Sequence, residues 1–442
     1  MSTFVQKLET ELGSEHIAPA NITNTYSVDG ISPEMVVTPQ NIDAASKTLA
    51  LANQSHKKVI PWGGGTQMWT GNIPDGVDII LQLNQLNNLI AHEPYDLTVS
   101  VEAGMTLESL QRHLAKKGQF LPLETPDPAR ATIGGILATN ASGPSRLSYG
   151  IARDWLIGTR IIHANGVCTK SGGTVVKNVT GYDLNKLYIG SLGTLGVIVA
   201  AHFKIAPLPK SQKTITASFQ NISDALIVAS DLIKLTFQPQ AMIILDNNAI
   251  EKLPSTAKLS VAPYRLALLI SGQSKSLVRK TKDTTCCINQ RTTTEELPES
   301  YNKELWQAIT NIGWGTSDEP MISLKVNLLP TQVTKFFDNI TDKDFGPTPA
   351  TIIDPWSGVI RLVWAQEKDF NDTARALMII NNIRTCSEQL GGYTTVERCP
   401  VELKVNLDVW GISSTSVKIM KRLKSNLDPL TTLNPGRFIG GI

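Results

Sequence analysis

Residues 60–71, IPWGGGTQMWTG, place three consecutive glycines directly after a short apolar stretch. Glycine permits positive φ and close approach of the backbone, so such a run exposes N–H groups that can bind an anion. A Walker-type phosphate loop would need a lysine after the glycines, but Thr66, Gln67 and Met68 stand there. A Rossmann fingerprint would need a helix start, which residues 69–74, WTGNIP, do not provide.

The remaining chemistry is a nest of backbone N–H groups around a diphosphate, supplemented by the Thr66 hydroxyl and the Gln67 amide. A plain glycine-rich turn is the alternative for this loop taken alone. Two further clusters favour the nest: ATIGGILATNASGP at residues 131–144 and IGSLGTLGVIV at residues 189–199. Small side chains there would let the backbone lie against a flat ring, with N–H groups meeting its heteroatoms.

The elements that must position these clusters indicate an α+β fold. Nineteen of the 32 glycines lie between Gly63 and Gly196, which marks this region as the centre of an N-terminal domain. Thr38 and Pro39 are expected as N-cap and first residue of a helix to His56, and Thr106 as the cap of a helix to Lys117. Strands are expected at residues 35–37, 58–60, 77–83, 97–103, 157–164 and 195–203.

Composition changes after Pro207-Leu208-Pro209, where glycine becomes sparse. Longer helix and strand patterns then follow, at residues 223–237, 266–270, 324–328 and 371–389. This predicts a second α+β domain, and no internal repeat is evident in its sequence.

The last predicted helix, residues 413–427, is amphipathic. Its apolar stripe consists of Val417, Met420, Leu423 and Leu427. Its other face carries Lys418, Lys421, Arg422 and Lys424. A core-facing helix with a solvated basic face is favoured over a membrane-binding helix.

Bulk composition excludes several classes of protein. The chain of 442 residues has a net charge of +2, which offers no electrostatic footprint for nucleic acid. Its five cysteines include no C-x-x-C, which argues against an iron–sulfur or zinc site and for a reducing compartment. The N-terminus lacks the apolar core of a signal peptide, and no apolar stretch reaches the roughly 18 residues of a membrane span. We therefore expect a cytoplasmic protein, for which any association with a membrane would be peripheral and through partners.

Taken in order, the motifs resemble a known family, the FAD-binding domain of the vanillyl-alcohol-oxidase / p-cresol-methylhydroxylase (PCMH) superfamily. They are P-x-G-G-G-T (61–66), V-E-A-G (101–104), T-I-G-G with N-A-S-G-P (132–144), Y-G-x-x-R-D (149–154), K-N-V-T-G-Y-D (177–183) and G-S-L-G-T-L-G-V-I (190–198). Two tail segments, LDVWG (407–411) and LNPGRFIGGI (433–442), narrow the resemblance to the FAD-binding E subunit of the glycolate oxidase complex.

The resemblance implies three parts of the chain and non-covalent FAD. Residues 1–209 would form the PCMH-type FAD-binding domain, residues 210–395 an α+β cap for substrate or partner, and residues 396–442 a segment that completes the first domain. Trp62, Gly63, Gly64, Gly65, Thr66 and Gln67 would hold the diphosphate. Pro126, Thr132, Gly134, Gly135, Ala138, Thr139 and Gly143 would line the ribityl chain and the isoalloxazine, and Gly196 and Ile198 would lie on the adenine side. Trp62 stands where many relatives carry arginine, and the loop has no histidine or cysteine to attach a flavin covalently.

The histidines limit the substrate chemistry. Related D-lactate and D-2-hydroxyglutarate dehydrogenases use histidines of the substrate domain to bind a divalent metal, whereas all six histidines here precede residue 203. We therefore expect no metal site. Lys325 and Arg361 are the candidates for a catalytic or substrate-binding role, with Arg398 and Asp408 as further charged residues; Lys177 and Tyr182 are more typical of turn structure.

The function implied by the resemblance is an FAD-linked oxidoreductase subunit that oxidises glycolate or a similar 2-hydroxy acid, together with flavoprotein and iron–sulfur partner subunits. A free-standing FAD dehydrogenase of unknown substrate and a non-catalytic structural subunit remain as alternatives. The colour of the purified protein would separate the last from the other two.

Overall fold

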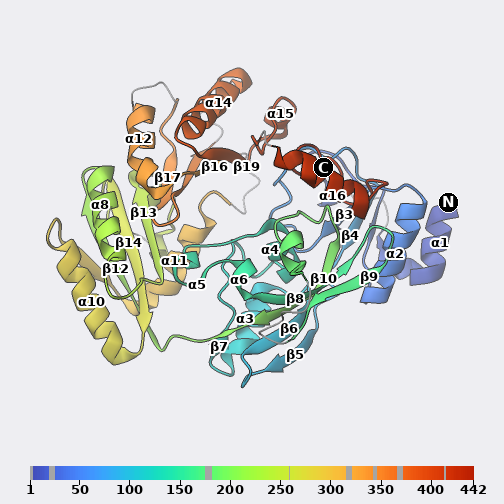
Figure 1. The fold of residues 1–442 in the computed structure, drawn as a ribbon, viewed down its shortest axis with the longest axis horizontal. Coiled ribbons are helices and arrows are strands. Elements are labelled where there is room, and N and C mark those ends of the chain that lie inside the picture. The colour runs from blue at the N-terminus through green and yellow to red at the C-terminus, as the bar shows by residue number, and fades with distance from the viewer. Residues whose placement is uncertain are drawn as a thin grey trace. The chain divides into compact units, whose positions relative to one another are not determined.

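The computed structural model describes residues 3–18, 25–174, 182–257, 259–314, 321–341, 346–365, 372–412 and 415–442 (Figure 1). The chain divides into two compact units. Unit 1 comprises residues 1–141, 151–208 and 412–442, and unit 2 comprises residues 142–150 and 209–411. Residues 396–411 thus belong to unit 2, and the chain returns to unit 1 at Ile412.

Unit 1 begins with a four-stranded sheet in the order β1-β2-β4-β3, in which β4 pairs in parallel with both β2 and β3. Its elements are α1 (Thr3–Leu12), η1 (Ser14–His16), β1 (Ile17–Ala18), β2 (Met35–Val37), α2 (Ile42–Gln54), β3 (Val59–Trp62) and β4 (Ile79–Gln82). Apolar side chains of α1 and α2, among them Leu8 and Leu49, share a core with the strands. The glycine loop therefore starts at the carboxyl end of a parallel strand.

The helix predicted to begin at Thr38 begins later. Asn41 is the N-cap of α2, and its side-chain oxygen accepts a hydrogen bond from the Ala44 N–H at 2.9 Å. The Thr38 N–H donates to the His16 carbonyl, next to the β1–β2 pair. The predicted cap at Thr38 is wrong, because the helix begins at Ile42 and the Asn41 side chain makes the capping hydrogen bond.

The second sheet of unit 1 is antiparallel, in the order β5-β6-β10-β8-β9. Its strands are β5 (Leu89–Glu93), β6 (Thr98–Glu102), β8 (Leu156–Ile162), β9 (Cys168–Gly172) and β10 (Val197–Lys204). Helices α3 (Leu107–Ala115), α4 (Ile133–Thr139), α6 (Ala152–Trp155) and α7 (Asn185–Tyr188) accompany it, with a small pair of strands, β7 (Gln119–Phe120) and β11 (Ala206–Pro207). Thr106 caps α3 as predicted, since its side chain accepts from the Ser109 N–H.

The C-terminal helix α16 (Ser416–Leu427) corrects one prediction. Lys424, assigned to the solvated face, is 5% exposed and is the residue of α16 that is buried. The predicted apolar stripe is only half-buried. Lys424 tolerates burial because its Nζ donates to the Asp428 carboxylate at 2.7 Å and to the carbonyls of Thr194 and Leu433, each at 2.8 Å.

Half-buried histidines make the stability of unit 1 dependent on pH. His202 on β10 contacts the Ser100 hydroxyl at 2.6 Å, and burial, with the nearby charges of Lys170 and Arg160, lowers its pKa from 6.5. Burial likewise lowers the pKa of His163. Because the folded-state pKa lies below the unfolded value, protonation favours the unfolded chain, so stability is lost as the pH falls below 6.5.

We expect the unfolding temperature to decrease between about pH 7.5 and pH 5.5. His202→Asn keeps a polar partner for Ser100 and removes the titrating group, so its unfolding temperature should depend less on pH over this range. Thermal denaturation followed by circular dichroism measures both slopes; identical slopes in the two proteins would contradict the role of His202.

Unit 2 is built on an eight-stranded antiparallel sheet in the order β15-β12-β14-β13-β17-β18-β16-β19. Its first half comprises β12 (Ser211–Phe219), α8 (Ile222–Ile233), β13 (Ala241–Asp246), α9 (Asn247–Glu251), β14 (Tyr264–Gly272), α10 (Ser274–Ile288) and β15 (Thr294–Leu297). Its second half comprises β16 (Met321–Asn327), α12 (Val333–Thr341), β17 (Ala350–Asp354), β18 (Val359–Ala365), α14 (Thr373–Gln389) and β19 (Tyr393–Arg398). Shorter elements are α5 (Arg146–Tyr149), η3 (Ser255–Ala257), η4 (Glu299–Tyr301), α11 (Asn302–Asn311), η5 (Pro330–Gln332) and α15 (Val401–Lys404).

Apart from the short helix α9 between β13 and β14, each half of this sheet has the strand and helix order βαββαβ, and the halves meet where β13 pairs with β17. The repeat is structural and is not visible in the sequence. Helices α8 and α14 pack on one sheet face around residues such as Ile244 and Leu324. Helix α11 packs on the other face, around residues such as Ile243 and Trp306. Within the described ranges, no helix is both long enough and apolar enough to cross a membrane.

Candidate functional site

The glycine loop leaves β3 and folds against the segment that precedes α4. A Cβ atom on Gly64 would lie 1.8 Å from the Arg130 carbonyl oxygen, and one on Gly63 would lie 2.1 Å from the Thr132 hydroxyl. Gly65 has φ +69°, which disfavours any other residue. Side chains are therefore missing at 63 and 64 because two protein segments approach closely, and this contact holds the loop beside α4.

Helix α4 is positioned by its cap. The Thr132 side chain accepts from the Gly135 N–H, and a Cβ on Gly134 would touch Ala103 at 3.0 Å. At Gly135 a Cβ would meet only the Thr132 hydroxyl, at 3.3 Å. Gly134 thus serves helix–strand packing, whereas Gly135 leaves open space beside the helix.

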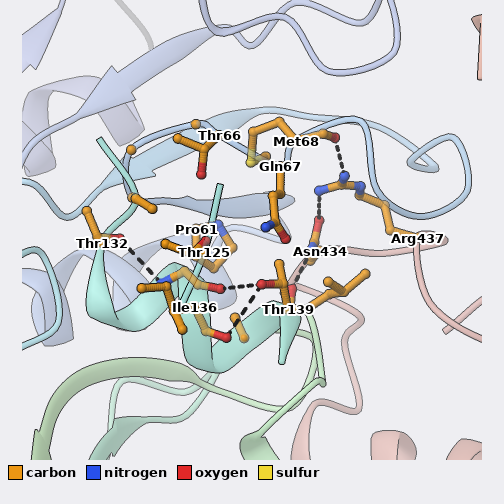
Figure 2. A pocket seen from close by; sticks show the side chains of 17 residues that line it. Pro61, Thr66, Gln67, Met68, Thr125, Thr132, Ile136, Thr139, Asn434 and Arg437 are labelled. Atoms are coloured by element: carbon orange, nitrogen blue, oxygen red, sulfur yellow. Dashed lines mark hydrogen bonds between the residues drawn. The ribbon is translucent and has the colours of Figure 1, made fainter. Parts of the chain in front are cut away.

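A cavity lies between the loop and α4 (Figure 2). Of the residues expected to hold a cofactor, nine line it: Gly63, Gly64, Gly65, Thr66, Gln67, Thr132, Gly135, Ala138 and Thr139. The structure thus brings two glycine clusters, separated by more than sixty residues of sequence, to one cavity. Thr139 also donates from its hydroxyl to the Gly135 carbonyl at 2.8 Å.

Other expected residues lie outside the lining. Trp62 lines a neighbouring cleft, where its ring meets Tyr26 edge-on at 5.1 Å. Gly196 packs against Ile161, which a Cβ would approach to 2.5 Å, and Ile198 is a buried residue of β10. Pro126 is buried next to Thr125, which does line the cavity. Gly143 belongs to unit 2.

Sequence reasoning missed the contribution of the C-terminal tail. Asn434 and Arg437 line the cavity, together with Pro61, Met68, Thr125, Ala131, Ile136 and Leu192. Figure 2 shows Arg437 and Asn434 beside the loop residue Met68, whose carbonyl accepts from the Arg437 guanidinium. The available signal was a basic residue embedded in the glycine-rich tail LNPGRFIGGI.

Unit 2 brings the two catalytic candidates together. Lys325 of β16 is the register partner of Arg361 on β18 and of Thr395 on β19. The Arg361 guanidinium donates to the Glu397 carboxylate at 2.7 Å and lies over the Trp314 ring at 5.3 Å from its centroid. Lys325, Arg361 and Glu397 form a group that we term the charged cluster.

Burial and the neighbouring charges shift the pKa values of Lys325 and Glu397 in the charged cluster. Burial lowers the pKa of Lys325, with Arg361 and Arg146 acting in the same direction and Glu397 opposing them. Burial also resists ionisation of Glu397, but attraction by Arg361 and Lys325 outweighs it and holds the pKa below its usual value. A half-buried ammonium group beside a half-buried guanidinium is suited to binding a carboxylate.

The remaining candidates have other surroundings. Arg398 is 9% exposed on β19, and the Asp408 carboxylate accepts from the Trp410 N–H at 3.3 Å. Tyr182 is 94% exposed, and Lys177 lies outside the described residues. Among the residues that the structure describes, no group of three or more His, Cys, Asp or Glu side chains gathers in a metal-binding arrangement.

The donor set of the cavity defines what it can bind. The loop backbone, the Thr66 hydroxyl and a buried guanidinium line the space, whereas the Thr139 hydroxyl and the first N–H groups of α4 already donate within the protein. Neutral N–H and O–H donors with one cation are complementary to a diphosphate that carries polyhydroxylated groups. A dinucleotide with a ribityl chain fits this donor set.

Comparison with known proteins identifies the cofactor domain. Residues 33–172 match the family model described as FAD binding domain. Over 434 residues the chain is 27% identical to the glycolate oxidase subunit GlcD of Bacillus subtilis (strain 168), an alignment that covers 92% of this chain and 89% of that protein. It is 26% identical over 427 residues to a mitochondrial D-lactate dehydrogenase [cytochrome] of Kluyveromyces lactis, covering 92% of this chain and 73% of that protein.

Solved structures agree on the fold. A p-cresol methylhydroxylase with bound substrate superposes with a TM-score of 0.76 at 16% identity, covering 98% of this chain and 96% of the other. An alkyldihydroxyacetonephosphate synthase superposes with a TM-score of 0.75 at 16% identity, covering 99% and 86%. The predicted α+β, PCMH-type FAD-binding fold and the predicted FAD cofactor are confirmed.

Proposed function

Taking residues 33–172 as an FAD binding domain, we propose that this oxidoreductase is an FAD-linked subunit in the oxidation of glycolate or a similar 2-hydroxy acid. The observation that carries the proposal is the match to a glycolate oxidase subunit along 92% of the chain. D-lactate and D-2-hydroxyglutarate dehydrogenases among the relatives support the same substrate class. The subunit would work with flavoprotein and iron–sulfur partners.

Unit 1 would bind FAD in the cavity. The loop Gly63–Gln67 would hold the diphosphate, and Thr132, Gly135, Ala138 and Thr139 would line the ribityl chain and ring. When bound, FAD supplies a two-electron acceptor for the hydride that leaves C2 of a hydroxy acid. None of the described residues that line the cavity is a histidine or cysteine, which supports non-covalent binding.

Unit 2, the cap of this proposal, would recognise the substrate carboxylate through the charged cluster. Lys325 offers an ammonium group, and the ion pair with Glu397 orients the Arg361 guanidinium. The cluster would bind and orient the acid. Its two positive charges would balance the negative charge of Glu397 and the negative charge of the glycolate carboxylate.

A spectrum of the purified protein tests the cofactor. We expect flavin absorbance, and acid precipitation should release the colour to the supernatant. Colour kept in the pellet would contradict non-covalent binding, and a colourless protein that takes up no added FAD would favour the non-catalytic structural subunit.

Anaerobic reduction tests the reaction. With the partner subunits present, glycolate should bleach the flavin rapidly, whereas the chain alone should react slowly or not at all. Rapid bleaching of the isolated chain by one member of a hydroxy-acid panel would favour the free-standing dehydrogenase. No reduction by any hydroxy acid in the assembled complex would contradict the proposal.

Substitution of Lys325 tests the carboxylate site. Lys325→Met should raise the KM for glycolate by roughly 10-fold or more, because a charge-assisted hydrogen bond contributes about 1.5–3 kcal/mol. Lys213→Met is the matched control, since Lys213 also lies on a strand of unit 2 and forms an ion pair with Glu296 at 2.7 Å. Steady-state kinetics should give a higher KM for Lys325→Met than for Lys213→Met. Equal KM values would contradict a role of Lys325 in binding the carboxylate.

A further inference from the structure

The charge that faces the glycine loop comes from the other end of the chain. Among the described residues that line the cavity, Arg437 is the one with a charged side chain. A Walker loop places a lysine directly after its glycines to meet a phosphate, and here Thr66, Gln67 and Met68 occupy those positions. The loop and the cation are therefore separate in sequence and meet only in the folded protein.

Arg437 is attached to the loop itself. Its Nη2 donates to the carbonyls of Met68 and Thr70, and its Nη1 donates to the Asn434 side-chain oxygen at 3.4 Å. The backbone follows the same path, since the Asn72 N–H donates to the Arg437 carbonyl at 2.9 Å. The guanidinium is thus fixed relative to the loop before any ligand arrives.

The tail that carries Arg437 is anchored at further points. Leu433 forms a parallel bridge with Val59, on the strand that leads into the loop. Asn434 donates from its side chain to the Leu192 carbonyl at 2.5 Å, and its N–H donates to the Val59 carbonyl at 2.8 Å. These contacts join the tail to the loop strand and to the third glycine cluster.

Arg437 carries its positive charge at neutral pH. Its side chain is 3% exposed, and burial lowers its pKa to about 10, while nearby Asp29 acts in the opposite direction. Burial in a site of low dielectric strengthens attraction between a guanidinium and a phosphate anion.

We propose that the C-terminal tail, through Arg437, forms the cationic half of the diphosphate-binding site. The glycine loop provides neutral N–H donors, and Arg437 provides the charge that a Walker loop carries on its lysine. The inference rests on the proposed binding of FAD in the cavity of unit 1. It extends that proposal by stating which part of FAD Arg437 recognises: the diphosphate, and not the flavin ring.

Two measurable consequences follow for ligands. Compounds that contain the diphosphate but no flavin ring, such as ADP and inorganic pyrophosphate, should compete with FAD for the apoprotein. Riboflavin has the ring without phosphate, so its affinity should be insensitive to the charge at position 437.

The experiment compares the wild-type apoprotein with Arg437→Gln and Arg437→Lys, using full-length chains. Dissociation constants for FAD and riboflavin are measured by quenching of flavin fluorescence, and apoprotein stability by circular dichroism. We expect Arg437→Gln to raise the dissociation constant for FAD by roughly 10- to 100-fold and that for riboflavin by less than about 3-fold. The dissociation constant of Arg437→Lys for FAD should lie between those of the wild type and Arg437→Gln. Equal weakening of both ligands would mean that Arg437 only supports the loop, and would overturn the inference.

Pyrophosphate competition on the wild-type protein keeps the test decisive if Arg437→Gln does not fold. Displacement of FAD by millimolar pyrophosphate, but not by equal ionic strength of chloride, supports the inference, and no displacement overturns it. Failure of the proposed function is a distinct result, because the wild-type apoprotein would then bind neither FAD nor riboflavin.

Discussion

Replacing Gly64 with alanine is expected to abolish FAD binding and to destabilise unit 1. The new Cβ would lie 1.8 Å from the Arg130 carbonyl oxygen and 2.6 Å from its carbonyl carbon. Because these atoms are backbone, no side-chain rotation relieves the contact, and the loop must move away from α4. Overpacking of this kind costs about 1–3 kcal/mol or more, and both walls of the cavity are displaced. The flavin absorbance of the purified variant and its thermal denaturation measure the two effects.

Two other glycines separate packing from ligand binding. Gly173→Ala is the neutral control, since a Cβ there meets nothing within 4 Å. Gly135→Ala should leave the apoprotein as stable as the wild type or more so, because alanine favours a helix by about 0.8–1 kcal/mol over glycine. Its methyl group would enter the cavity, so the variant should bind FAD more weakly than the wild type does, although its apoprotein is stable. Retention of full flavin content in Gly64→Ala would contradict the placement of the loop against residues 130–132.

Replacing Lys424 with methionine is expected to give the largest loss of stability. The Lys424 Nζ is the buried partner of Asp428, which is fully buried and also accepts from the N–H groups of Thr432 and Leu433. Removal of the cation leaves this carboxylate buried without its counter-charge, which costs about 3–5 kcal/mol. Chemical denaturation should report this loss. Because Thr432 and Leu433 lead directly to Asn434 and Arg437, flavin retention should decrease as well.

A double variant tests whether the loss arises from the uncompensated carboxylate. Lys424→Met with Asp428→Asn should be more stable than Lys424→Met alone, since the buried charge is gone. Lys418→Met, on an exposed position of the same helix, should stay within about 0.5 kcal/mol of the wild type. A single Lys424→Met variant as stable as Lys418→Met would contradict the structural role of the pair.

Local signals in the sequence predicted much of unit 1. The strand Met35–Val37 and the cap of α3 at Thr106 follow from apolar stretches and a hydroxyl before a helix, which act over a few residues. The cap of α2 was misplaced because Thr38 and Asn41 are both plausible caps locally. The structure places Asn41 at the cap, while the Thr38 N–H donates to the carbonyl of His16, which is distant in sequence.

Side-chain surroundings were less predictable than elements. Lys424 has the sequence character of a surface residue, and only the carbonyls of Thr194 and Leu433 make its burial favourable. Likewise, nothing along the chain relates Lys325 to Arg361 and Glu397. The register of three strands places them together, and strand register depends on the whole sheet.

The sequence by itself determined the ligand class, because three glycine clusters and the absence of a Walker lysine are properties of the residues and their spacing. Tertiary structure alone decided why Gly63 and Gly64 lack side chains, which is contact with residues 130–132, and where the cation of the cavity comes from, which is the tail. The physical reason is the range of the interactions. Conformational preferences of glycine act within a few residues, whereas steric fit and charge pairing act between segments that meet only after folding.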